Sequence, residues 1–465
     1  MRGGPPVGVS VPEGPSEGRA AAAETPLRKH RDLYLWLLLG NALIILTFWW
    51  YGSGRSSFGG TIAVINGLGR LAALLGTYLV LWQLLLMSRL PWLHRAFGSQ
   101  VVVRLHRWNG YLALGLLVAH GALQTLGYEI AAGIGPLQQL WRFIVAYPGL
   151  LAAIVALAML LVVVASTVVI VRRHIAYHTW YFVHLYTYVA IALAFSHEIL
   201  VGTDFIKDRA FTVYWCALYA AVVVLLLTTR VARPAMLLAS HGFRVQEVRH
   251  EAEGVFSIHI SGRDIGSLGY RAGQFVQLRF LDRRRWWESH PFSLSEAPTG
   301  QRLRVTVKAL GDHSAALAGV RPGTPVLLEG PFGSLDARSD PDARALLVGG
   351  GIGIAPLRAL AEEMSGRGTD VCLLYRAQDE SELIFRDELD AGARGLTTHY
   401  LLDHPDGAPG RWFEPEELRR LVPDAGEREA YICGPRRMML DVERTLRGIG
   451  VARRRIHLEG FSYWQ

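Results

Sequence analysis

The distribution of apolar and polar residues divides the chain into two halves of different character. Up to about residue 230, Leu, Ala, Val and aromatic residues form long apolar segments, and beyond it short alternating runs carry regularly spaced charges. Six segments of the first half approach the roughly 20 apolar residues that a helix needs to cross a bilayer. They lie at about 33–51, 61–88, 105–127, 149–171, 180–200 and 211–229. We therefore expect an all-α bundle of six transmembrane helices.

Basic residues concentrate in the loops on one side of these segments. They are Arg28, Lys29 and Arg31 before the first segment, Arg89, Arg95, Arg104 and Arg107 between the second and third, Arg172 and Arg173 after the fourth, and Arg230 and Arg233 after the sixth. By the positive-inside rule, we expect a multi-pass protein of the cell inner (plasma) membrane with both termini in the cytoplasm. The same bias accounts for the net charge of +8 without a nucleic-acid partner, and it predicts contact with membrane lipid.

The chain start and the cysteines limit the alternatives. The first 28 residues are rich in Gly, Pro and Ala, which predicts a disordered tail, and no short apolar segment typical of a cleaved signal peptide precedes the first span. The three cysteines, Cys216, Cys372 and Cys433, form no CxxC pair. That spacing argues against a disulfide framework and against a Cys-rich zinc or iron–sulfur site.

The second half contains two further patterns. From about residue 240, the runs "FRVQEVRH", "VFSIHIS", "QFVQLRF", "RLRVTVKAL" and "TPVLLEG" read as short strands between Gly, Asp and Pro turns. Such strands are typical of a small antiparallel β-barrel. From residue 344 the order becomes strand, glycine loop, helix, with further strands in "DVCLLYRA", "TTHYLLD" and "EAYICG". This order predicts a parallel α/β domain, so the whole chain is expected to be a multidomain membrane protein.

Two of the apolar segments carry a histidine near each end. His106 and His120 are 14 residues apart in the third segment, which is about 21 Å along a helix and close to four full turns. His184 and His197 are 13 residues apart in the fifth segment, which turns the second ring by about 140° from the first in a regular helix. Either that helix is locally distorted, or its two imidazoles approach their partners from different sides.

Four histidines at two matched depths are suited to two stacked haems, each taking one axial imidazole from each helix. We predict that His106 with His184 and His120 with His197 ligate two haem b groups, the second pair nearer the outside. The alternative is a set of packing histidines that hydrogen-bond across the bundle. Arg70 lies inside the second segment, where a guanidinium requires an anion. A haem propionate is one candidate, and snorkelling of Arg70 to the outer interface is the other.

Four motifs in the second half carry candidate chemistry. "HPFSLSEAP" (290–298) follows the strand pattern "GYRAGQFVQLRF". "KALGDHSAAL" (308–317) combines a glycine turn with a serine at a helix start, where free backbone N–H groups can bind phosphate. "GGGIGIAP" (349–356) directly follows the apolar run "ALLV", so its glycines allow the backbone to approach a dinucleotide pyrophosphate. "YICGPRRMM" (431–439) ends the fourth strand of the α/β pattern.

These motifs resemble those of the ferredoxin–NADP reductase superfamily, and within it the membrane NADPH oxidases and ferric reductases. The segment "YHTWYFVHLYTY" (177–188) likewise resembles the fifth-helix signature of the ferric-reductase-like transmembrane domain, a family with both 13- and 14-residue ligand spacings. The resemblance implies FAD, NADPH and two haem b as cofactors. It also implies three domains, a di-haem domain at 31–235, an FAD-binding β-barrel at 236–338 and an NADPH-binding α/β domain at 339–465. The predicted disordered cytoplasmic tail at 1–30 has no counterpart in the family.

The resemblance assigns roles to individual residues. Phe292 is expected to stack near the flavin ring and Ser293 to hydrogen-bond its reactive edge. His290 is expected to face the ribityl–phosphate side of the flavin, and Pro291 belongs to the same flavin-binding motif. The remaining residues are expected to bind phosphate (Lys308, Gly311, Ser314), the dinucleotide (Gly349, Gly350, Gly351, Gly353, Pro356), its 2′ position (Arg376) and the region of the nicotinamide (Cys433, Gly434, Pro435). Cys433 is alternatively a buried small hydrophobe. Phe461 is expected to cover the flavin, with Trp464 as a competitor.

The expected activity follows from the order of these parts. Electrons from cytosolic NADPH are expected to pass through FAD and both haems to an external small molecule. With O₂ as acceptor, the product is superoxide, and Arg70 suits its charge. Two alternatives stay open: a transmembrane ferric or cupric reductase, and an electron-transfer subunit that donates to a partner protein. The sequence indicates no obligate protein partner.

Overall fold

The long apolar segments fold into helices that are long enough to cross a membrane. The computed structural model describes residues 18–90, 92–93, 97–168, 175, 177–333, 335, 344–392, 395–403 and 410–460, without the side chains of residues 18–31, 99, 100, 177, 178 and 313. Within these residues six helical stretches have the length and hydropathy of a span: Asp32–Phe58, Thr61–Leu86, Val101–Ala132, Leu150–Thr167, Thr179–Val201 and Arg209–His241. This result confirms the six predicted spans.

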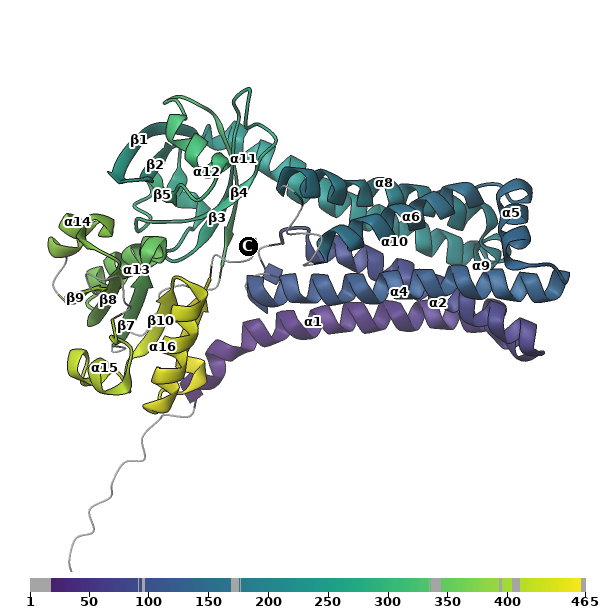
Figure 1. Ribbon diagram of the computed structural model, residues 1–465, viewed down its shortest axis with the longest axis horizontal. Helices are drawn as coiled ribbons and strands as arrows, with labels where there is room; N and C mark the ends of the chain where they lie inside the picture. The colour runs from purple at the N-terminus through teal and green to yellow at the C-terminus, as the bar shows by residue number, and fades with distance from the viewer. Residues whose placement is uncertain are drawn as a thin grey trace, which may run out of the picture. The chain divides into compact units, whose positions relative to one another are not determined.

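The helices of the first half are labelled in Figure 1. They are α1 (Gly18–Trp49), the π-helix η1 (Trp50–Gly54), the 3₁₀ turn η2 (Arg55–Phe58), α2 (Thr61–Leu86), α4 (Ser99–Ala132), α5 (Pro136–Ala146), α6 (Leu150–Thr167), α8 (Tyr177–Val201), α9 (Thr203–Lys207), α10 (Arg209–Leu227), the π-helix η3 (Thr228–Ala232) and α11 (Arg233–His241). Because α1 begins at Gly18, residues 18–30 of the predicted tail are helical, in keeping with the helix propensity of their alanine run. The sequence pattern did not predict α5, a short helix that starts with a proline at its first turn.

The chain divides into two compact units, one containing residues up to 78 with 113–211, the other containing 79–112 with those from 212 onward. In the first unit, glycines on α2 allow α4 to approach closely. A Cβ added at Gly76 would lie 3.0 Å from Leu117 Cδ2 and 3.2 Å from Leu116 Cβ. Membrane helices use small residues in this way because apolar surface gains little from leaving lipid. In the same unit α6 and α8 run alongside each other.

The second half contains two domains built on sheets. Its strands are β1 (Arg244–Ala252), β2 (Val255–Ser261), β3 (Phe275–Phe280), β4 (His290–Ser293), β5 (Arg302–Lys308), β6 (Val326–Phe332), β7 (Ala345–Gly350), β8 (Val371–Ala377), β9 (Leu396–Leu402), β10 (Glu429–Cys433) and β11 (Ile456–Glu459). Among the described residues, β1-β2-β5 and β4-β3-β6 form two antiparallel sheets, joined by a bridge between Leu294 and Val305. Their inward-facing Val, Ile, Leu and Phe side chains form one core.

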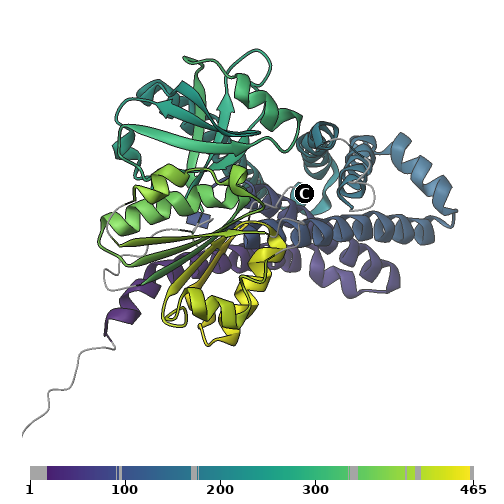
Figure 2. The same cartoon turned by 60° about the vertical axis from the view of Figure 1, so that its left-hand side comes forward.

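The last domain is a parallel sheet covered by helices on both faces. Its strand order in the described residues is β11-β10-β7-β8-β9, with every neighbouring pair parallel. Residues of α13 (Ile354–Gly366) pack on one face, and residues of α15 (Pro415–Leu421) and α16 (Arg436–Gly448) pack on the other (Figure 2). The remaining helices of this half are α12 (Asp312–Ala316) and α14 (Arg386–Asp390). The predicted class of an all-α membrane bundle followed by an antiparallel and a parallel β domain is confirmed.

The close approach of α2 and α4 can be tested at a single glycine. We expect Gly76→Leu to destabilise the membrane half by about 1–3 kcal/mol, because the larger side chain must displace Leu116 and Leu117. The matched control is Gly115→Leu on α4, where an added Cβ has no described neighbour within 4 Å. Thermal unfolding of the purified chain in detergent measures both changes. Equal losses in the two variants would contradict this packing.

Candidate functional site

His120 on α4 is held by a backbone carbonyl of α2. Its Nδ1 lies 2.9 Å from the carbonyl oxygen of Gly69, inside the first compact unit. A carbonyl oxygen only accepts hydrogen bonds, so Nδ1 carries the proton and Nε2 of the neutral ring presents its lone pair. A histidine that ligates a metal is typically oriented by such a second hydrogen bond. His120 therefore fits the requirements of an axial ligand.

His197 on α8 belongs to the same unit as His120. The two imidazoles are near enough to interact electrostatically, and their ligation of one haem stays a prediction. The Nδ1 atom of His197 is buried and has no hydrogen-bond partner among the described residues, which is unusual for a buried polar group. No three His, Cys, Asp or Glu side chains gather as a metal-binding group in the described part of the chain, whereas bis-imidazole ligation requires only two.

His106 and His184, the predicted inner pair, each have their own described contacts. The backbone carbonyl of His106 accepts a hydrogen bond from Gln83 Nε2 at 2.7 Å, and His184 lies 5.2 Å from the ring of Trp180. Helix α8 is α-helical from Tyr177 to Val201, without a π or 3₁₀ turn between its histidines. Its rings therefore leave the helix in different directions, and local distortion is not the explanation of the 13-residue spacing. Ligation by His106 and His184 stays a prediction.

Arg70 lies beside a carboxylate that the sequence reasoning did not consider. Its Nε is 3.8 Å from Asp204 Oδ2 on α9, and its Nη2 donates a hydrogen bond of 3.3 Å to Ser57 Oγ. The Asp204 side chain is only 6% exposed. In this structure Asp204 supplies the anion that a buried guanidinium requires. A role of Arg70 toward a haem propionate or an acceptor stays a prediction.

The "HPFSLSEAP" motif forms β4 and the turn after it. Phe292 pairs with Val276 of β3 and is half-buried, Ser293 is buried, and Pro291 is exposed, while His290 begins the strand. Two residues later the carbonyl oxygen of Ser295 accepts hydrogen bonds from Arg304 Nη2 at 2.8 Å and from Arg358 Nη1 at 3.2 Å. The barrel contributes Arg304 and α13 contributes Arg358, so the flavin-type motif is connected directly to the helix that follows the glycine loop.

Glu388 completes this junction. It forms ion pairs with both arginines, at 2.8 Å from Arg304 Nη1 and 2.8 Å from Arg358 Nη2. Burial alone would raise the pKa of Glu388, but the hydrogen bond and the charge of Arg304, with the charge of Arg358, hold that pKa below its usual value. Sequence reasoning missed all three residues, because isolated charges in strand and helix patterns resemble ordinary surface positions.

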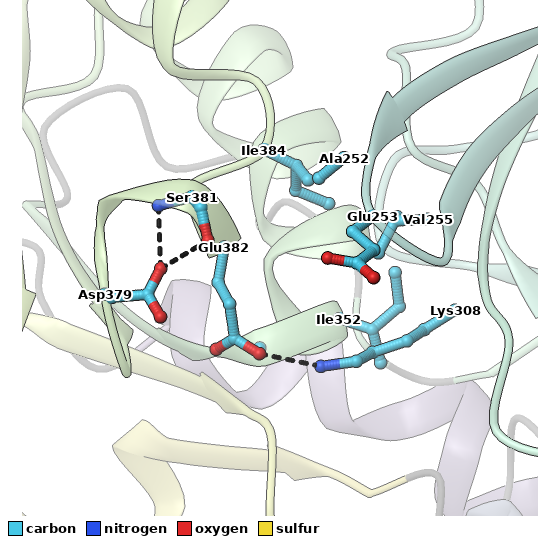
Figure 3. A pocket seen from close by; sticks show the side chains of 10 residues that line it. Ala252, Glu253, Val255, Lys308, Ile352, Asp379, Ser381, Glu382 and Ile384 are labelled. Carbon is cyan, nitrogen blue, oxygen red and sulfur yellow. Dashed lines mark hydrogen bonds and ion pairs between the residues drawn. The ribbon is translucent and has the colours of Figure 1, made fainter. Parts of the chain in front are cut away.

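Some backbone N–H groups in and beside the segment predicted to bind phosphate are already hydrogen-bonded to one of its own side chains. Ser314 Oγ accepts hydrogen bonds from the backbone N–H groups of Leu310 at 2.9 Å and Gly311 at 3.1 Å. One of these donors, the N–H of Gly311, belongs to the segment that was predicted to bind phosphate. Lys308 instead lines a cavity of about 300 Å³ together with Gly351 of the glycine loop and the segment from Asp379 to Glu382. Figure 3 shows its Nζ, 3.2 Å from Glu382 Oε1. Lys308, which the resemblance assigns to phosphate binding, and Gly351 of the glycine loop therefore line the same cavity.

The two nucleotide motifs contact each other. Gly349, the second-to-last residue of β7, pairs with Cys433 of β10 in the parallel register, and Gly351 begins the turn at a φ of +53°. A Cβ added at Gly353 would collide with the carbonyl oxygen of Cys433, lying 2.6 Å from its carbon. A Cβ at Gly350 would meet the side chains of Met438 and Pro435, and Gly434 approaches the backbone of Gly350. Pro356 follows, buried in the first turn of α13.

Cys433 itself is fully buried in the core. Burial raises the pKa of its thiol well above the usual range, and the carboxylate of Glu459 adds to the shift. The thiol is therefore protonated at neutral pH and packs as a small apolar group in this structure. Its position near a nicotinamide stays a prediction, and Phe461 and Trp464 lie outside the described residues.

Arg376 ends β8 and is oriented by a second buried carboxylate. Its Nε and Nη2 donate hydrogen bonds of 3.0 and 2.8 Å to the two oxygens of Asp403, whose side chain is 7% exposed. This side-on pairing uses one edge of the guanidinium and directs the Nη1 edge away from Asp403. Asp403 lies in "TTHYLLD", a segment predicted to form a strand. Its ion pair with Arg376, at the end of the neighbouring strand, was not predicted.

Comparison with known families accounts for most of these features. Residues 72–195 match the family described as "Ferric reductase like transmembrane component", 240–335 match an FAD-binding domain, and 347–444 match an oxidoreductase NAD-binding domain. The chain therefore belongs to the family of proteins that join a ferric-reductase-like transmembrane domain to a ferredoxin–NADP-reductase-type module. Its three matched parts are those of a membrane-embedded oxidoreductase with FAD-binding and NAD-binding domains.

Several relatives match the chain in part. An NADPH oxidoreductase of Mycobacterium tuberculosis is 30% identical over 227 residues, covering 47% of this chain and 59% of that protein. Ferredoxin–NADP reductase B of Sorangium cellulosum is 31% identical, covering 42% of this chain and 86% of that protein. A solved ferredoxin NADP⁺ reductase from Neisseria gonorrhoeae is 25% identical with a TM-score of 0.40, over 47% of this chain and 97% of that one.

The contact between the glycine loop and β10 can be tested by one methyl group. We expect Gly353→Ala to destabilise the nucleotide-binding domain by about 3 kcal/mol, because its Cβ collides with rigid backbone at Cys433. Gly366→Ala at the other end of α13 is the matched control, since an added Cβ there meets nothing described within 4 Å. Thermal unfolding and NAD(P)H-dependent dye reduction measure the effect. A Gly353→Ala protein as stable as the control would refute the close approach.

Proposed function

We propose that the protein is a transmembrane NADPH oxidase that passes electrons from cytosolic NADPH to external O₂ and releases superoxide. The balanced reaction is NADPH + 2 O₂ → NADP⁺ + H⁺ + 2 O₂•⁻. When bound, FAD would accept an electron pair and release single electrons, and two haem b groups would relay these electrons across the bilayer. The protein would lie in the inner (plasma) membrane with both termini in the cytoplasm.

The hydrogen bond from His120 to Gly69 carries this proposal. It holds a neutral imidazole inside a spanning helix, with its free nitrogen available and His197 close by. Nδ1 of His197 is buried without a hydrogen-bond partner among the described residues, which is unfavourable in an apolar setting unless the ring has another role. With His106 and His184, these residues would hold the two haems. Each haem would be held by two of these histidines and would supply one-electron transfer to O₂.

The module in the second half would bind the other two cofactors. The strand β4 with Phe292 and Ser293, and the segment from Lys308 to Ser314, would hold FAD. The glycine loop from Gly349 to Gly353 would hold the dinucleotide, because its close packing against β10 leaves backbone rather than side chains at the end of β7. The junction of Arg304, Arg358 and Glu388 would keep the two binding motifs in one arrangement.

NADPH is the proposed electron donor because Arg376 ends β8 with one guanidinium edge directed away from Asp403. That edge would bind the 2′-phosphate. A second candidate, NADH, is favoured by the neutralisation of Arg376 by Asp403 and by the acidic residues Glu253, Asp379 and Glu382 around the cavity. The two donors differ only in the 2′-phosphate, so this single group decides between them.

The acceptor and the haems can be tested together with the purified full-length chain in nanodiscs. We expect NADPH-dependent cytochrome c reduction that superoxide dismutase abolishes and that stops without oxygen. We also expect a six-coordinate haem spectrum with two haems per chain, and His120→Ala should lose one of them because its Nε2 is an axial ligand. His250→Ala, on the exposed strand β1, is the control. Reduction of cytochrome c, ferric or cupric complexes without oxygen would instead identify an electron-transfer subunit or a metalloreductase.

The donor preference can be tested at Arg376. We expect Arg376→Gln to lower kcat/KM for NADPH by about tenfold or more and to leave NADH unaffected, since it removes one charge-assisted hydrogen bond. The control is Arg386→Gln, an exposed arginine on α14. The double variant Arg376→Gln/Asp403→Asn avoids leaving a buried carboxylate unpaired and should show the same selectivity. Equal losses with both donors would show that Arg376 does not recognise the 2′-phosphate.

A further inference from the structure

A set of polar groups surrounds Arg70 within the first compact unit. We call it the Arg70 cluster, and it consists of Arg70 on α2, Asp204 on α9 and Ser57 on η2, with Ser53 on η1, whose carbonyl oxygen accepts a hydrogen bond from Ser57 Oγ at 2.9 Å. A π-helix such as η1 is uncommon and frequently marks a functional position. Here the π-turn brings Gly52 against Asp204, since a Cβ added at Gly52 would lie 3.7 Å from Asp204 Oδ1.

The polar groups of the Arg70 cluster are incompletely satisfied. Arg70 Nε and Asp204 Oδ2 are 3.8 Å apart, which is an ion pair but too long for a direct hydrogen bond. Arg70 Nε, Asp204 Oδ1 and Ser53 Oγ are all buried without a hydrogen-bond partner among the described residues. The Asp204 side chain is more than nine-tenths buried. A donor and two acceptors that face no described partner are the groups that a small polar guest would bind.

The position of Asp204 is fixed by packing rather than by its charge. The neighbouring residue Phe205 lies 4.9 Å from the ring of Phe211, which in turn stacks on Phe48 of α1 at 4.8 Å. Phe205 and Phe211 are both buried. The carboxylate is therefore held beside Arg70 by an aromatic stack that does not include either charged residue.

The Arg70 cluster is next to the proposed haem ligand. Gly69, whose carbonyl orients His120, immediately precedes Arg70 on α2. A charge at Arg70 therefore acts on the place where an electron would leave the His120 site. A lone guanidinium there would attract anions, and a lone carboxylate would attract cations. At distances well beyond their own separation of 3.8 Å, the paired groups leave only the weak field of a dipole.

We infer that Asp204 determines the charge class of the external acceptor by neutralising Arg70, so that the site favours a neutral molecule such as O₂ over charged metal complexes. This inference rests on the proposed function and specifies its acceptor. Asp204 acts here as a specificity-determining residue through Arg70, and it need not touch the acceptor. The sequence predicts Arg70 and outer loops of mixed charge, but it does not predict the net charge beside Arg70. The ion pair with Asp204 provides that net charge.

The test uses the full-length, haem-loaded protein in vesicles with its nucleotide-binding side facing out. NADPH is added outside, and either ferric–EDTA, an anion, or hexaamminecobalt(III), a cation, is trapped inside. The measured quantity is the ratio of the two reduction rates under anaerobic conditions, which cancels differences in haem loading. The variants are Asp204→Asn, Arg70→Gln and the double variant. Asp208→Asn is the matched control, because it removes the same charge nearby while an asparagine can still cap α10.

We expect Asp204→Asn to raise the anion-to-cation ratio at least about fivefold, as one unmasked charge a few ångströms away would. Arg70→Gln should lower it by a similar factor, and the double variant should return it to within about twofold of the wild type. The midpoint potential of the outer haem provides a readout other than activity. It should rise in Asp204→Asn and fall in Arg70→Gln, because an added positive charge favours the reduced state.

The outcomes separate this inference from the proposed function. A wild-type protein without a six-coordinate haem spectrum overturns both. A haem-loaded protein in which Asp204→Asn changes the ratio no more than Asp208→Asn overturns the inference alone. If Asp204→Asn fails to fold, comparison of Arg70→Gln with the double variant isolates the Asp204 charge, and an unchanged ratio between those two proteins also overturns the inference.

Discussion

A guanidinium group that leaves water requires an anion beside it, and the candidate functional arginines of this protein all meet that requirement. Arg70 lies against Asp204 among the spans, and Arg376 lies against Asp403 at the end of β8. Removing one partner would leave an uncompensated buried charge, which is far less favourable than either the pair or its absence. The carboxylates therefore decide how much positive charge each site presents, and in which direction.

The same interaction organises the junction between the barrel and the nucleotide-binding domain. Arg304 and Arg358 come from different domains, share Glu388, and donate to the carbonyl oxygen of Ser295. Because Ser295 belongs to the "HPFSLSEAP" motif and α13 begins at the glycine loop, the ion pairs connect the two cofactor motifs through backbone. Arg304 is almost completely buried, so solvent screens this junction little. These contacts hold the two motifs in one arrangement.

Periodicity predicted the elements well where they are long. The six spans and the regularly alternating strands were recognised because hydropathy repeats over many residues. The strand β4 spans only His290–Ser293 and contains a proline, so it has no alternation to detect. The partners Asp204 and Asp403 could not be predicted, because each lies in a different element from its arginine and a lone aspartate in a loop resembles any exposed acid. The glycine motifs were recognisable, because close backbone approach restricts the residue type itself.

The spacing of the histidines shows how a structure decides between readings that a sequence leaves open. Thirteen residues in a regular helix separate two side chains by about 140°, so His184 and His197 can face one side only if α8 is distorted. Helix α8 is continuous over its described length, so the two rings point to different sides. His184 and His197 are therefore expected to find their partners on different sides of α8. Histidines on such a helix face different sides of it. The positions of the neighbouring spans, and not the residue spacing within α8 alone, therefore determine which imidazoles come together.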